Sequence, residues 1–128
     1  EDQDGETQFG GLGSVQVALI LMDFLAMSVD GPSLYVWFDS IGARHSEMLA
    51  RLLERRGLTE EAAGLRAGMA LFPPPFPDQD NLRWDAMAQM DAATLAQFDS
   101  LVPEDSHDRI RAEMLNLARE NGLMAPRP

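Results

Sequence analysis

The segment from Val15 to Val29 constrains the fold most strongly, because nearly every residue in it is apolar. It is shorter than the run of about 20 apolar residues that a membrane-spanning helix needs, and Asp23 interrupts it near its centre. Its length and its many Leu, Met and Ala residues favour a helix over a strand, with Ser14 as a suitable N-cap. We therefore expect a central buried helix over residues 15–29, around which the rest of the chain packs.

The remaining apolar residues recur at helical spacing between clear turn signals. Five further segments are predicted to be helical: 41–56, 59–72, one beginning at Asp78 or Asp80, one capped by Asp91, and one between Pro103 and Gly122. Residues 33–38 fit either a short strand or one to two helical turns. Because no alternating pattern is strong enough to build a sheet, the prediction is an all-α, single-domain bundle of about six helices.

The 128 residues suffice for one domain with one core. Residues 1–13 are acidic and rich in glycine, so we expect a flexible lead-in there. The helical domain is predicted over residues 14–123, with 124–128 as a tail. The chain has no cysteine, which excludes disulfides and thiolate metal sites and favours the cytoplasm.

Charge is the most informative feature for function. The net charge of −11 argues against direct binding of nucleic acid, because the phosphate backbone would be repelled. Residues 73–108 contain eight acids and one base, whereas residues 44–72 contain four acids and five arginines. The acids of the first block are the candidate partner-binding residues: Asp78, Asp80, Asp85, Asp91, Asp99, Glu104, Asp105 and Asp108. Helix capping and solubility are the alternative explanation for each of them.

Catalytic and metal-binding motifs are weak. Ser106, His107 and Asp108 are the residue types of a hydrolase triad, but neighbours on one helical turn point in different directions, and helix capping explains Ser106 better. The segment 78–81 lacks the glycine and the closing glutamate of a calcium loop. His45 fits a half-buried structural histidine. We therefore expect no enzyme activity, no cofactor and no metal.

Several segments in order along the chain resemble the bacterial DNA-mimic protein family. The first is the segment Asp30-Gly31-Pro32-Ser33-Leu34-Tyr35-Val36-Trp37-Phe38-Asp39-Ser40, followed by Ile41-Gly42-Ala43 and a Leu-rich helix. A second helix then ends in Ala70-Leu71-Phe72-Pro73, before an acidic loop and an Asp-rich helix. The similarity covers roughly residues 14–120. Asp30 and Asp39 replace asparagines that are usual in the family, Pro32 replaces a glycine, and Tyr35 replaces a glutamine.

The resemblance implies a small acidic helical protein that mimics the charge of DNA, forms a homodimer and covers the DNA-binding surface of a basic transcription factor. Its motif segment includes Asp30, Gly31, Tyr35, Trp37, Phe38 and Asp39. For the three aromatic residues, core packing competes with a role at a groove edge or dimer seam. Two other functions stay open: an immunity-type inhibitor of a basic nuclease toxin, and a helical scaffold without a decoy role.

Overall fold

A computed structural model describes residues 14–30 and 34–123, and the regular structure in these two ranges is entirely helical. The α-helices are α2 (Val15–Asp30), α3 (Tyr35–Asp39), α4 (Ser46–Arg55), α5 (Thr59–Met69), α6 (Asp80–Ala88), α7 (Ala92–Gln97) and α8 (Ser106–Glu120). Two 3₁₀ helices are η1 (Ile41–His45) and η2 (Phe98–Ser100). The predicted all-α class is confirmed. The predicted lead-in (1–13), Gly31 and the predicted tail (124–128) lie outside the described ranges.

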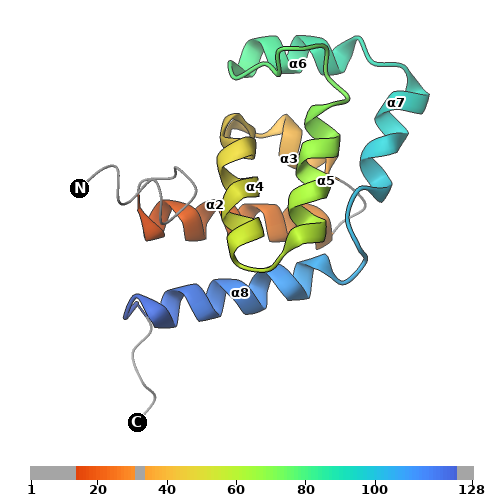
Figure 1. The fold of residues 1–128 in the computed structure, drawn as a ribbon. Helices are drawn as coiled ribbons and strands as arrows, with labels where there is room; N and C mark the ends of the chain where they lie inside the picture. The colour runs from red at the N-terminus through yellow and green to blue at the C-terminus, as the bar shows by residue number, and fades with distance from the viewer. Residues whose placement is uncertain (1–13, 31–33, 124–128) are drawn as a thin grey trace.

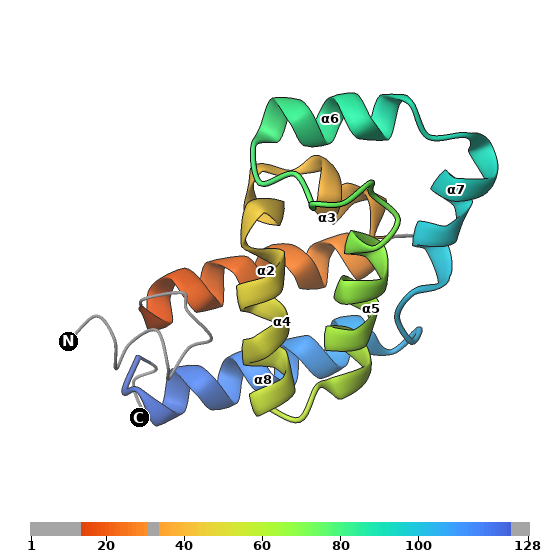
Figure 2. The same cartoon turned by 45° about the horizontal axis from the view of Figure 1, so that its top comes forward.

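The two longest helices form the base of the bundle. α2 and α8 run side by side in opposite directions, and the α4–α5 hairpin crosses them (Figures 1 and 2). α6 crosses the opposite end of the hairpin, and α7 follows the outer side of α5 toward the beginning of α8. Residues from α6 to α8 therefore form an outer border of the molecule.

α2 is buried on one face and exposed on the other. The prediction of a central buried helix therefore holds for one face of α2 only. Ala18, Met22 and Ala26 are fully buried, whereas the Ile20 side chain is 66% exposed and Met27 is 56% exposed. The predicted N-cap is confirmed, because the Ser14 hydroxyl accepts a hydrogen bond from the Val17 N–H at 3.2 Å. In the described ranges, no helix has the length and apolar character required to cross a membrane.

Gly57 forms the turn between α4 and α5, which pack as a helical hairpin. This residue has a φ of +84°, which glycine adopts without strain, and the Leu58 N–H donates back to the Leu53 carbonyl at 2.8 Å. Leu58, whose side chain is buried, occupies the N-cap position of α5. The pattern over 41–56 likewise divides into η1 and α4.

Phenylalanine side chains from distant segments join the α6–α8 border to the hairpin. The ring centroids of Phe38 and Phe98 are 5.5 Å apart, and those of Phe38 and Phe72 are 5.6 Å apart. Phe76 packs against Phe72 at 5.0 Å. Because Phe38, Phe72 and Phe98 are buried, this cluster fixes η2 against α3 and the end of α5.

Candidate functional site

The candidate site is the border formed by residues 78–108, which we call the acidic arm. It comprises α6, α7, η2 and the first residues of α8, and it contains all eight acids that the sequence identifies as partner-binding. In both views of the ribbon it runs along the outside of the molecule from α6 to α8 (Figures 1 and 2).

The arm is anchored at its first helix by two consecutive side chains. Arg83, the single base of residues 73–108, is fully buried, and its Nε and Nη2 donate to the carbonyls of Phe38 (2.8 Å) and Ser40 (2.6 Å). The indole Nε1 of Trp84 donates to the intervening carbonyl of Asp39 at 2.8 Å. Carbonyls at the end of α3 are thereby satisfied from α6.

This anchoring determines which side chains of α6 are buried. Leu82 and Trp84 are 49% and 42% exposed, while Arg83 and Met87 are buried. The hydrogen bonds to α3 require a long donor side chain at the buried position, and they override the hydrophobic pattern.

Asp80 is the one acid of the arm whose charge is offset inside the protein. Its two carboxylate oxygens lie 2.8 Å from Arg83 Nη2 and 2.8 Å from Arg44 Nη2. The hydrogen bond from Arg83 is the main cause that lowers the pKa of Asp80, and Arg44 adds to it. Asp80 therefore helps to attach the arm and offers little charge to a partner.

Asp91 combines a structural role with an exposed charge. It is the N-cap of α7, as predicted, and its carboxylate accepts a hydrogen bond from the Thr94 N–H at 2.8 Å. This backbone hydrogen bond lowers the pKa of Asp91, so the carboxylate stays ionised at neutral pH.

Seven carboxylates of the arm are exposed and form no ion pair with any residue in the described ranges. They are Asp78, Asp85, Asp91, Asp99, Glu104, Asp105 and Asp108. Asp39, whose backbone carbonyl accepts the Trp84 hydrogen bond, is also exposed and also forms no ion pair with a described residue. Within the described chain, unpaired carboxylates thus concentrate on the arm and beside its anchor.

Apart from Asp39, the acids outside the arm whose side chains the structure describes form ion pairs, several of which join different helices. Ion pairs join Asp23 to Arg111, Glu47 and Glu54 to Arg66, Glu60 to Arg109, and Glu113 and Glu120 to Arg56. Most arginines of residues 44–72 and of α8 therefore form ion pairs with acids of the protein itself. Among the described residues, the acids without an ion pair therefore belong mainly to the acidic arm.

The motif segment lies mainly in the core. Trp37 and Phe38 are fully buried, and Trp37 Nε1 donates to Ser46 Oγ at 2.8 Å, which confirms the core-packing interpretation for both. Tyr35 is 40% exposed and makes an edge contact with the Phe98 ring at 6.2 Å. Asp39 is exposed, and the side chain of Asp30 lies outside what the structure describes.

The three triad-type residues do not converge. Asp105 occupies the N-cap of α8, so the predicted capping role of Ser106 is wrong: its hydroxyl is buried and donates to Glu61 Oε2 at 2.6 Å. His107 Nδ1 lies 2.8 Å from the carbonyl oxygen of Ala26. Across residues 14–30 and 34–123, no three His, Asp or Glu side chains gather closely enough to hold a metal ion.

Sequence reasoning missed two features that the structure reveals. The first is the buried Arg83, which the sequence presents only as an isolated base in an acidic block. The second is a pocket between α2 and η1, which depends on how two separate segments meet. Comparisons with protein families, with curated proteins and with solved structures find no match to this chain.

Proposed function

We propose that this protein is an acidic binding module whose arm occupies the basic DNA-binding surface of a regulatory protein, in the manner of the DNA-mimic family that it resembles. The observation that carries the proposal is the distribution of unpaired acids: seven exposed carboxylates of the arm lack an ion pair within the described chain. A surface that served only solubility would not need unpaired acids to collect on one border.

Charge density supports a surface built from several segments. Duplex DNA carries one negative charge per about 1.7 Å, whereas a helix with one exposed acid per turn carries one per about 5 Å. The arm joins α6, α7, η2 and the start of α8 in one continuous border, so several segments contribute acids to it (Figure 1).

The rigid attachment of the arm also supports the proposal. Arg83 and Trp84 fix its beginning to α3, and Phe98 fixes its middle to the aromatic cluster. Carboxylates on a preorganised border lose less conformational entropy on binding than carboxylates on a mobile tail.

The test is affinity capture from the native cell with two variants of equal net charge. The arm variant is D85N/D91N/D99N, in which asparagine preserves the N-cap at position 91. The control variant is D23N/E54Q/E120Q, which neutralises three exposed acids that are ion-paired outside the arm. Circular dichroism first verifies that both variants are folded.

We expect capture to fall about tenfold or more for the arm variant and to change little for the control. Equal losses would mean that only net charge matters, and unchanged capture by the arm variant would refute the proposal. Mass spectrometry then identifies the target: a transcription regulator supports DNA mimicry, whereas a nuclease toxin would assign the arm to an immunity-type inhibitor.

A further inference from the structure

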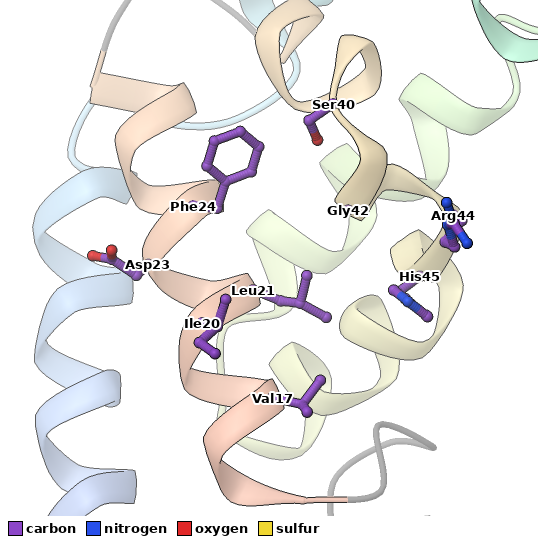
Figure 3. A pocket seen from close by; sticks show the side chains of 9 residues that line it. All are labelled: Val17, Ile20, Leu21, Asp23, Phe24, Ser40, Gly42, Arg44 and His45. Carbon is purple, nitrogen blue, oxygen red and sulfur yellow. The ribbon is translucent and has the colours of Figure 1, made fainter. Parts of the chain in front are cut away.

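A pocket of about 570 Å³ lies between α2 and η1 (Figure 3). Its volume falls in the range of about 300 to 1,000 Å³ that is typical of small-molecule sites. Val17, Leu21 and Phe24 contribute from α2, and Gly42 and His45 contribute from η1.

The lining is mainly aliphatic and aromatic. Leu21 is buried, whereas Val17 and Ile20 at the rim are 40% and 66% exposed. Exposed aliphatic side chains beside a hollow gain free energy when an apolar molecule removes them from water.

His45 supplies a polar group that no other described residue satisfies. It is half-buried and lines the pocket, and its ring nitrogens have no hydrogen-bond partner among the described residues. Burial is the main cause that lowers the pKa of His45, and the adjacent Arg44 lowers it further, so the imidazole is neutral at neutral pH. A neutral imidazole has one donor and one acceptor nitrogen to offer.

The charged groups at the pocket are offset by partners outside it. Asp80 lies 2.8 Å from Arg44 Nη2, and Arg111 Nη2 lies 3.1 Å from Asp23 Oδ1. The net charge of −11 also disfavours an anionic ligand. Because the charged side chains at the pocket are already paired and the protein is acidic, we expect the ligand to be neutral.

We propose that this pocket binds a small, neutral, largely apolar molecule whose single hydrogen-bonding group pairs with the His45 imidazole. An aromatic amine, alcohol or amide fits this description. Asp80 is the acid of the arm that pairs with a residue of the pocket lining, Arg44. The seven exposed carboxylates that carry the proposed function are not used in this proposal, so neither proposal depends on the other.

The probe is N-phenyl-1-naphthylamine, a neutral fluorophore with one N–H group that brightens in apolar surroundings. We expect saturable binding to the full chain, and a loss of at least about tenfold in affinity for Ile20→Glu, which places a charge on the rim. Met27→Glu is the matched control, because Met27 is also exposed on α2 but does not line the pocket. Its affinity for the probe should be unchanged.

The hydrogen bond is tested with His45→Phe and with 1-phenylnaphthalene, which lacks the N–H group. The variant should bind the amine about fivefold more weakly and the hydrocarbon no more weakly than the parent protein does. Absence of binding, or equal losses for Ile20→Glu and Met27→Glu, would overturn the proposal. So would size-exclusion data in which Ile20→Glu converts a dimer to a monomer, since a second copy would then cover this face.

Discussion

The buried guanidinium of Arg83 donates a hydrogen bond of 2.8 Å from its Nε to the carbonyl oxygen of Phe38, 45 residues earlier in the chain. Phe38 in turn packs its ring against Phe98 of η2, with 5.5 Å between centroids. One residue of the core thus contacts the acidic arm at two places, through its backbone and through its ring. This relationship couples the position of the arm to the integrity of the core.

Arg83→Met should lower the free energy of unfolding by about 2–4 kcal/mol, because it leaves the carbonyls of Phe38 and Ser40 without donors and Asp80 without its buried partner. Urea denaturation followed by circular dichroism measures the change. Arg55→Met is the control: Arg55 is exposed and forms no ion pair in the described chain, so its effect should stay within about 0.5 kcal/mol. Similar values for the two variants would contradict the anchoring role of Arg83.

Ser106→Ala should cost about 1–3 kcal/mol of unfolding free energy, because the buried Glu61 Oε2 loses the donor that lies 2.6 Å away. The double variant Glu61→Met/Ser106→Ala removes both buried polar groups and should be more stable than Ser106→Ala alone. Denaturation of the two single variants and the double variant gives the coupling energy. Additive effects would show that the hydroxyl and the carboxylate do not depend on each other.

Gly64→Ala should destabilise the protein, although alanine is the better helix former by about 1 kcal/mol. A Cβ at this position would lie 2.5 Å from the Leu101 carbonyl oxygen and 2.5 Å from Val102 Cγ1, so the end of the arm would have to move away from α5. We expect a loss of about 1–3 kcal/mol in urea denaturation. Ala63→Gly, at an exposed position of the same helix, should lose only the helix propensity of about 1 kcal/mol. A stabilised Gly64→Ala variant would contradict the close packing.

The contribution of Asp80 to stability should disappear in acid. Its pKa is lowered from the ordinary value of 3.8 mainly by the Arg83 hydrogen bond, so the stabilisation is present above that value and is lost as the pH falls through the folded-state pKa. The difference in urea midpoint between the wild type and Asp80→Asn should therefore be constant above about pH 5 and shrink toward about pH 3. A difference that grows in acid would have the wrong sign for this ion pair.

Local sequence signals predicted the helical class and several helix ends. Asp91 caps α7, and Gly122, with a φ of +68°, ends α8 with the Leu123 N–H donating to the Ala118 carbonyl at 2.9 Å. Caps and glycine turns depend on residues within one turn of each other, so the sequence is sufficient to place them. The cluster of eight acids within residues 73–108 was likewise apparent from the sequence alone.

Long-range contacts were not predictable in this way. The buried Arg83 and the Ser106–Glu61 hydrogen bond each join residues 45 positions apart, and hydrophobic periodicity carries no information about such partners. Nothing in the sequence therefore indicated that Arg83 is buried, and helix capping was the wrong interpretation of Ser106. Which acids are ion-paired depends on the same tertiary geometry, so the sequence could not separate Asp80 from its exposed neighbours.

Competition between this protein and duplex DNA for the captured partner tests the central claim most directly. The partner is held on the immobilised wild-type protein, and release is measured as duplex DNA is added at salt concentrations from about 50 to 300 mM. If the arm occupies a DNA-binding surface, DNA should release the partner in a saturable manner, and binding to the protein should weaken steeply with salt. A partner that stays bound at saturating DNA, with an affinity insensitive to salt, would contradict the account.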